Sequence, residues 1–278
     1  MINQLKTLVL LGILTVILLF IGKFIAGTTG LTVAFIFVLL MNFFAYWYSD
    51  KIVLAMYKAK PLPKTSWLYG EVKKLASKAK IPLPKLYLIE AQQPNAFATG
   101  RNPKHASIAV TSGLMGLLSK EEISGVIAHE ISHIKNRDTL ISCIAAVIAG
   151  TIAYVAMLAR WAAIFGMAGR DERNANAFAL LALAIVTPLI ATLTRLAISR
   201  AREYLADETG ARLVGSPAPL ANALSKLESA SRHVTLKGNP ATAHMFIVNP
   251  FSGKALLELF STHPNTENRI RRLLSLKI

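Results

Sequence analysis

Cysteine and acidic residues are scarce in this chain. Cys143 is the single cysteine among 278 residues, so no intramolecular disulfide and no cysteine-rich zinc site can form. Only 15 Asp and Glu residues oppose 31 Lys and Arg residues, which gives a formal net charge of +16. The basic residues are scattered and form no nucleic-acid-binding motif or aromatic–basic stripe, so a DNA- or RNA-binding function is not indicated. The sequence also lacks internal repeats and low-complexity tails.

Hydrophobic residues make up 53% of the chain, and the mean hydropathy of +0.45 is too high for an ordinary soluble domain. Four uncharged apolar runs occur, at residues 7–22, 31–48, 139–159 and 174–194. Each is close to the ~20 residues that cross ~30 Å of hydrocarbon, so the sequence predicts four transmembrane helices in two hairpins. A cleaved signal peptide is the alternative for the first run. For the last two, the alternative is a hairpin that is buried in a soluble domain or only dips into the bilayer.

The basic residues also predict how the chain lies in the membrane. With four spans, 27 of the 31 Lys and Arg residues fall on one face, the exceptions being Lys23, Arg160, Arg170 and Arg173. Because loops rich in Lys and Arg stay on the cytoplasmic side, both termini and the long polar segments are expected in the cytoplasm. The basic excess therefore mainly reflects topology, with some attraction to anionic lipid headgroups.

The polar segment between the second and third runs is predicted to combine helices with a small sheet. Apolar residues at helical spacing predict an amphipathic helix over 65–78. Alternating patterns predict three short strands, at 85–90, 95–99 and 107–111. Ser119 and Glu122 form a capping box, which opens a helix that is expected to continue through Asn136.

Residues 129–133 read H-E-I-S-H, an H-E-x-x-H pattern, and fall in the middle of that last helix. Residues four apart lie on one face of an α-helix, so the imidazoles of His129 and His133 can bind one tetrahedral Zn²⁺. Glu130, beside the first histidine, could take a proton from a zinc-bound water. The pentapeptide alone arises by chance in about a per cent of chains of this length, so a third ligand is needed to support a metal site.

A second acidic pair could complete the site. Residues 195–208 follow the fourth run without Pro or Gly, so they are expected to form a helix on which Glu203 and Asp207 share a face. Glu203 can supply the third zinc ligand, and Asp207 can accept the N–H of a ligating imidazole. The alternative is a solvated charged helix face, and Arg202 and Glu208 are expected at the surface.

Several motifs together resemble the HtpX-type membrane metalloproteases, relatives of the CAAX prenyl protease family. They are H-E-I-S-H, S-R-A-R-E-Y-L-A-D from Ser199, P-N-A-F-A-T-G from Pro94, M-F-I-V-N-P-F-S-G from Met245 and S-T-H-P-N-T-E-N-R-I from Ser261. This resemblance implies a zincin-like (gluzincin) domain in which His129, His133 and Glu203 bind one Zn²⁺ per chain and Glu130 is the catalytic base. It also implies quality control of membrane proteins under stress. Asn265 replaces a proline of many relatives, which affects a helix start and not the chemistry.

Three further residues are candidates for substrate contact. His263 could lie over the zinc and stabilise the oxyanion of the tetrahedral intermediate. A structural role at the start of a helix over 265–276 is the alternative. Asn95 and Ala96 could belong to an edge strand that binds the substrate backbone by strand addition, the alternative being an ordinary turn.

The sequence thus predicts a mainly α integral membrane protein with four transmembrane helices and a cytoplasmic α+β catalytic domain. The expected parts are a transmembrane hairpin, the first part of the catalytic domain, a second hairpin and the second part of the catalytic domain, at 1–48, 49–138, 139–194 and 195–278.

The predicted function is that of a zinc endopeptidase which cleaves misfolded or damaged membrane proteins on the cytoplasmic side of the cell (inner) membrane. Its expected partners are protein substrates and the lipid bilayer, without nucleic acid. The alternatives are a CAAX-type prenyl-protein protease, a zinc-binding scaffold without catalysis, and a transporter. A transporter is disfavoured because no predicted span carries an ionisable residue at its centre.

Overall fold

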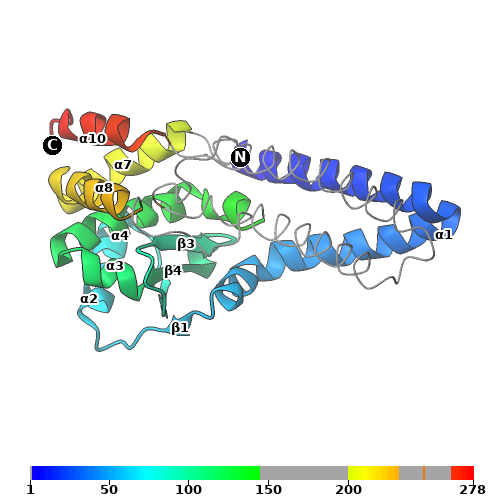
Figure 1. Cartoon of the computed structure of the whole chain (residues 1–278), viewed down its shortest axis with the longest axis horizontal. Helices are drawn as coiled ribbons and strands as arrows, with labels where there is room; N and C mark the ends of the chain where they lie inside the picture. The colour runs from blue at the N-terminus through cyan, green and yellow to red at the C-terminus, as the bar shows by residue number, and fades with distance from the viewer. Residues whose placement is uncertain (1, 145–199, 232–246, 248–263) are drawn as a thin grey trace.

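A long helical arm projects from an α+β body in the part of the chain that this computed structural model describes, which is residues 2–144, 200–231, 247 and 264–278 (Figure 1). The arm is α1 (Ile2–Met56). The body contains a four-stranded mixed sheet and a set of shorter helices. A mainly helical protein with a small sheet was predicted, and this coarse architecture is confirmed.

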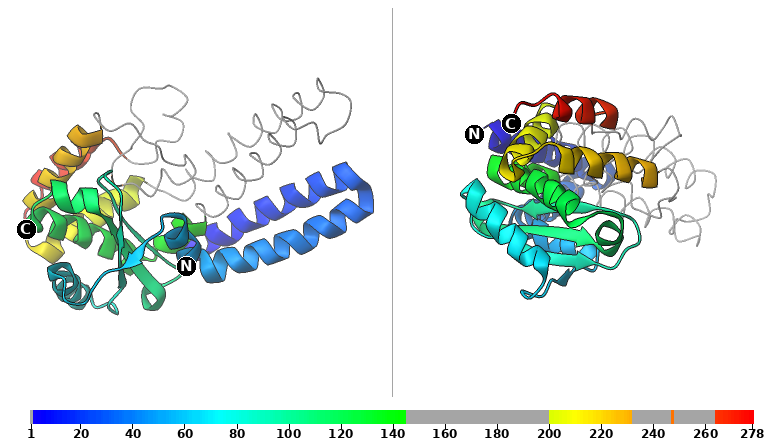
Figure 2. Two further views of the ribbon diagram at one scale, coloured as in Figure 1. Left: turned by 60° about the horizontal axis from the view of Figure 1, so that its bottom comes forward. Right: turned by 90° about the vertical axis from the view of Figure 1, so that its left-hand side faces the viewer.

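Helix α1 folds back on itself near its middle, so that its two halves lie side by side (Figures 1 and 2). Gly27 has a φ of +58°, a left-handed conformation that glycine adopts without steric cost. The Nδ2 group of Asn42 donates a hydrogen bond to Thr15 Oγ1 at 3.0 Å, across 27 positions of sequence. A straight helix would separate these residues by about 40 Å, so the bond joins two antiparallel halves.

The second half of α1 is the stretch of the described chain that could cross a membrane. Gly27–Met56 is long and apolar enough by length and composition, and only 11% of its most apolar part is buried in the protein. The helix continues past residue 48, where the second apolar run was expected to end, because Val53 and Leu54 pack against Ile89 and Phe97 of the sheet. The third and fourth predicted spans lie almost entirely outside the described residues, so the structure leaves them as predictions.

The sheet has the strand order β1-β2-β4-β3. Its members are β1 (Lys60–Pro61), β2 (Lys85–Ile89), β3 (Ala96–Gly100) and β4 (Ala106–Thr111). Strands β2 and β4 are parallel, whereas β1 pairs with β2 and β3 pairs with β4 in antiparallel fashion. The three predicted strands agree with β2, β3 and β4 to within one residue at each end. Strand β1 was not predicted, because two residues that include a proline carry no alternation.

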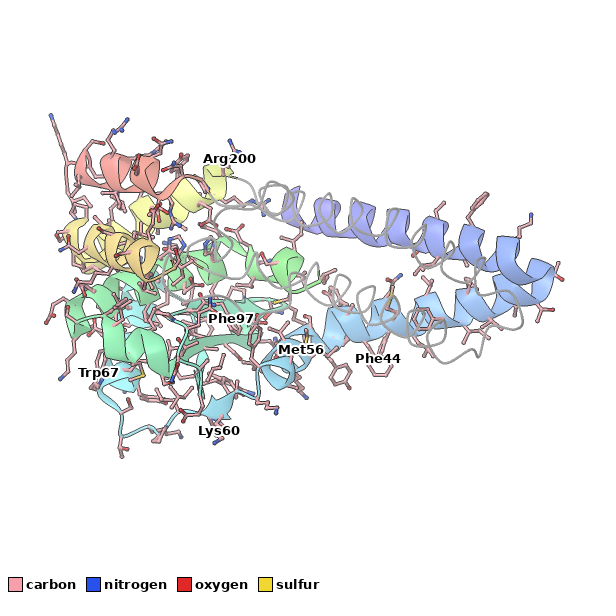
Figure 3. All side chains as sticks on the ribbon, in the orientation of Figure 1. Phe44, Met56, Lys60, Trp67, Phe97 and Arg200 are labelled. Atoms are coloured by element: carbon pink, nitrogen blue, oxygen red, sulfur yellow. The ribbon has the colours of Figure 1, made fainter. Side chains whose placement is uncertain are left out.

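The end of α1 is attached to this sheet. The rings of Tyr57 and Phe97 lie 5.3 Å apart, and Figure 3 labels Phe97 on the sheet and Met56 at the end of the arm. Strand β3 is an edge strand of the described sheet, and it lies beside α4.

Helix α4 (Lys120–Asn136) runs through the centre of the body. The predicted capping box is present: Ser119 Oγ accepts from Glu122 N, and Glu122 Oε2 accepts from Ser119 N at 2.8 Å. One side of α4 faces the sheet and α2 (Trp67–Ala79), and the other faces α7 (Arg200–Val214) and α8 (Ala218–Ser231). Helix α10 (Thr266–Leu274) packs on α7 and α8, as the right-hand view of Figure 2 shows. Two short elements, η1 (Pro103–His105) and α3 (Ser112–Leu117), flank β4.

Because helices and sheet cover α4 on both sides, Ile123, Ile127, Ile131 and Ile134 are completely buried. The polar residues between these isoleucines therefore lie inside the protein.

Candidate metal centre

The two histidines of H-E-x-x-H project from one face of α4 toward each other. Their Nε2 atoms are 3.1 Å apart, and the His129 side chain is only 2% exposed. Glu203 of α7 faces them from the other side. Its Oε1 lies 3.4 Å from His133 Nε2 and its Oε2 lies 3.7 Å from His129 Nε2. One donor atom from each of the three residues falls within 4.8 Å of the other two.

The backbones of α4 and α7 approach each other closely at Gly210. A Cβ atom added at Gly210 would lie 2.9 Å from the backbone nitrogen of His129 and 3.1 Å from the carbonyl carbon of Ala128. Only a residue without a side chain permits this contact, which brings the earlier turns of α7, with Glu203 and Asp207, onto the histidine face of α4. The helix expected from residue 195 onward thus passes through Gly210 and continues to Val214.

A carboxylate lies next to the Nδ1 atom of each imidazole and orients the ring. Asp207 Oδ1 lies 2.9 Å from His129 Nδ1, and Asp138 Oδ2 lies 3.2 Å from His133 Nδ1. When a carboxylate accepts the Nδ1–H group of a histidine, the lone pair of Nε2 is left to face a metal. Asp138 reaches this position because α4 ends at Asn136 and the C-cap residue Arg137, in a left-handed conformation (φ of 59°), turns the chain back.

Arg269 of α10 holds Asp207 in place. Its side chain is 1% exposed; Nε donates to Asp207 Oδ2 at 2.9 Å and Nη2 donates to Asp207 Oδ1 at 2.7 Å. Its Nη1 group donates to the carbonyl oxygen of Ile247 at 3.0 Å and lies 3.7 Å from Glu203 Oε2. Burial alone would raise the pKa of Asp207, but Arg269 and His129 lower it to about 2. Asp207 is therefore an ionised acceptor.

Glu130 lies on α4 between the sheet and the histidine cluster. Its Oε2 atom accepts a hydrogen bond from Ala98 N of β3 at 2.8 Å. Burial raises the pKa of Glu130 above its usual range, and the charge of Glu203 adds to this effect, while the two histidines oppose it. A carboxyl group with a raised pKa is suited to accept and return a proton near neutral pH.

The charge of the cluster fits a divalent cation. Burial alone would lower the pKa of His133, but Asp138, Glu203 and Glu130 raise it to about 9. The surrounding carboxylates therefore favour a positive charge at this position. Two imidazole nitrogens and one carboxylate oxygen are also a donor set that zinc prefers in catalytic sites, so the residues present fit the expected metal.

The other candidates lie in different surroundings. The backbone N–H of Asn95 donates to Thr111 Oγ1 and its carbonyl oxygen accepts from Thr111 N, each at 2.9 Å, while its side chain accepts from Ile247 N. Asn95 is therefore a buried residue that joins two segments, and the substrate contact expected from the sequence stays a prediction. Ala96 is buried in edge strand β3. His263 lies outside the described residues.

Sequence reasoning missed Asp138 and Arg269 and misplaced Arg202. Arg202 was expected at the surface, but its side chain is only 16% exposed and its Nη1 group lies 3.4 Å from Asp138 Oδ1. An acidic residue shortly after H-E-x-x-H is a weak signal for Asp138. Arg269 lies four residues before Leu273, so the two share a face of α10, but an arginine on the apolar side of a basic helix is a weak signal for a buried ion pair.

Comparison with known proteins agrees with this geometry. The model of peptidase family M48 matches residues 63–277. Curated relatives of this chain are named protease HtpX homolog. The one from Thermodesulfovibrio yellowstonii is 55% identical, over 98% of this chain and 97% of the relative. The one from Pyrococcus furiosus is 54% identical, over 96% of this chain and 94% of the relative. The crystal structure of S. mikatae Ste24p has a similar fold, with a TM-score of 0.53 and 21% identity over 98% of this chain and 65% of that chain. The chain belongs to peptidase family M48.

Proposed function

We propose that this membrane protease is a zinc-dependent endopeptidase in which His129, His133 and Glu203 hold one zinc ion and Glu130 is the catalytic base. The convergence of three donor atoms from α4 and α7 beside Glu130 carries this proposal. Asp207 and Asp138 keep the two imidazoles oriented toward the metal.

Zinc held at this position would polarise the scissile carbonyl and make the attacking water more acidic. Glu130 accepts the proton of that water and returns it to the leaving amine. The hydrogen bond from Ala98 N fixes the orientation of the Glu130 carboxylate, so the base is held in place before the substrate arrives.

Strand β3 is proposed to bind the substrate backbone. In an edge strand, successive residues alternate between the neighbouring strand and the open edge. The N–H and C=O groups of Asn95 point to Thr111 of β4, so those of Ala96 are directed away from β4, as is the N–H of Ala98 that meets Glu130. An extended peptide paired at Ala96 would lie beside the catalytic base. His263 remains a proposed stabiliser of the oxyanion.

The proposed substrates are misfolded or damaged membrane proteins, cleaved on the cytoplasmic side of the cell (inner) membrane. The exposed apolar arm supports a membrane location for the body that it carries. The excess of Lys and Arg in the segments flanking the apolar runs supports a cytoplasmic site.

A comparison of two glutamate variants on α4 tests the proposal. Glu130→Gln is expected to retain one zinc per chain in metal analysis and to lose cleavage of casein and of a membrane substrate in detergent by about 10²–10⁴-fold. Glu121→Gln removes an exposed carboxylate from the same helix and should cleave like wild type. In the wild type, a chelator should abolish cleavage and zinc should restore it. A zinc-loaded Glu130→Gln protein that cleaves at the wild-type rate would refute the assigned base, and a zinc-loaded wild type without cleavage would favour the scaffold.

A further inference from the structure

A cavity separate from the metal centre lies where the second half of α1 meets the sheet. It encloses about 570 Å³, within the range of small-ligand sites. Aromatic residues of α1, namely Phe43, Trp47 and Tyr48, form one side of it. Residues of the sheet and of its connections form the other side, and none of the residues of the metal centre lines it.

The cavity collects positive charge from distant parts of the sequence. Lys51 of α1, Lys85 at the start of β2, Arg101 after β3 and Lys104 of η1 all line it, against the single carboxylate of Asp50. These four cations come from three segments, namely α1, β2 and the connection between β3 and β4, which the fold brings together. Such a convergence favours a ligand with negative charge.

Two of these cations lie against the aromatic rings. The Arg101 guanidinium lies 4.7 Å from the centroid of the Trp47 ring, and its Nη1 group donates to the Trp47 carbonyl oxygen at 3.2 Å. Lys51 Nζ lies 5.1 Å from the centroid of the Tyr48 ring. Stacking fixes the plane of a guanidinium, and a planar guanidinium matches the oxygens of a phosphate.

If the second half of α1 crosses a membrane, its length places the cavity at the depth of lipid headgroups. Twenty residues separate Trp47 from the turn at Gly27, which corresponds to about 30 Å of helix and hence to the thickness of the hydrocarbon core. Trp and Tyr are enriched where that core meets water. Toward the turn from Trp47, Leu39, Leu40 and Phe44 are exposed, and Figure 3 shows Phe44 projecting from the arm.

We propose that this cavity binds the phosphate group of an anionic phospholipid, with the acyl chains lying along the exposed apolar side of α1. Lys85 and Lys104 attract the phosphate, and Arg101, fixed on Trp47, supplies directed N–H groups. An acidic peptide would match the cations equally well, but the aromatic wall and the apolar band that continues from it match a lipid. This inference depends on the place of α1 in the membrane and not on the proteolytic mechanism.

Native mass spectrometry of the full-length protein in detergent tests the proposal, because micelles remove the general attraction of a charged bilayer. Wild type should bind phosphatidylglycerol more tightly than phosphatidylcholine. Lys85→Gln/Lys104→Gln should weaken phosphatidylglycerol binding about fivefold for each lysine, so about 25-fold together, and should weaken phosphatidylcholine binding by less, because choline neutralises its phosphate. Both lysines are exposed, so the variant is expected to fold.

The matched control is Lys64→Gln/Lys73→Gln, which removes two exposed lysines that do not line the cavity and should bind like wild type. If the control and the test variant lost phosphatidylglycerol affinity equally, the proposed site would be wrong, since net charge alone would then explain binding. Equal binding of the two lipids would also overturn it. If glycerol 3-phosphate or a short acidic peptide bound as tightly as the lipid at these lysines, the assignment to a phospholipid would be wrong.

Discussion

Arg269→Gln should damage both the stability of the protein and its affinity for zinc. The substitution removes a guanidinium that is 1% exposed and donates two hydrogen bonds to Asp207, at 2.9 and 2.7 Å. Asp207 is itself buried and depends on Arg269 for the lowering of its pKa to about 2. Removal of one partner from a buried ion pair costs about 3–5 kcal/mol, because the other charge stays behind without compensation.

The effect on zinc binding follows from the contact between Asp207 and His129. Asp207 lies 2.9 Å from His129 Nδ1, so a displaced or protonated Asp207 no longer orients that imidazole. Loss of such a supporting group lowers metal affinity by about 10–100-fold. Arg269→Lys keeps the charge but not the two-point contact, and we expect an intermediate loss for it.

Arg212→Gln provides the matched control, because Arg212 also pairs with a carboxylate of α7. Its contact with Glu208 is 3.1 Å long, but the arginine side chain is 55% exposed, so its loss should cost at most about 1 kcal/mol. The assays are chemical unfolding of the metal-free protein in detergent and zinc titration against a competing chelator. If Arg269→Gln unfolds like Arg212→Gln and binds zinc like wild type, the proposed support of His129 through Asp207 is wrong.

Two further variants test how the site is assembled. Gly210→Ala should destabilise the protein by about 1–3 kcal/mol and weaken zinc binding, because the new Cβ would lie 2.9 Å from His129 N. Gly70→Ala, at a position of α2 with open space around the added Cβ, is the control and should not destabilise the protein. Unfolding and zinc titration are the measurements, and a Gly210→Ala protein with wild-type zinc affinity would contradict the close contact. Asp138→Asn should lower zinc affinity about tenfold, because Asp138 contacts the His133 imidazole. Asp207→Asn should lower zinc affinity by more, because it also disrupts the pair with Arg269. A loss of zinc affinity in Asp138→Asn that equals or exceeds the loss in Asp207→Asn would contradict this ranking.

Local signals explain what could be predicted from the sequence. The capping box at Ser119, the isoleucine spacing of α4 and the alternation of β2 to β4 are set by neighbours in sequence, and those elements were located to within a residue or two. His129 and His133 share a face for the same local reason. The pairing of Glu203 with them required an additional chemical argument, namely that a zinc ion on two histidines lacks a ligand.

Contacts between distant segments explain what could not be predicted. Arg269 is 62 residues from Asp207 in sequence, and its burial depends on the packing of α10 against α7 and α8. Asn95 was a candidate for substrate contact because its segment alternates like a strand, and its contacts with Thr111 and Ile247 were not predicted. Neither role leaves a periodic pattern, since each depends on one side chain meeting one partner.

The charges around α4 explain why these supporting residues matter as a group. Four buried carboxylates, those of Glu130, Asp138, Glu203 and Asp207, face two guanidinium groups, those of Arg202 and Arg269. With neutral histidines, this cluster lacks two positive charges, which is the charge of one divalent cation. The excess of carboxylates raises the pKa of His133, whereas the pKa of Glu130 is raised mainly by its burial and further by the charge of Glu203. Arg269→Gln would deepen the deficit by one charge, and because it also weakens zinc binding, the protein with zinc bound should lose more stability from that substitution than the metal-free protein.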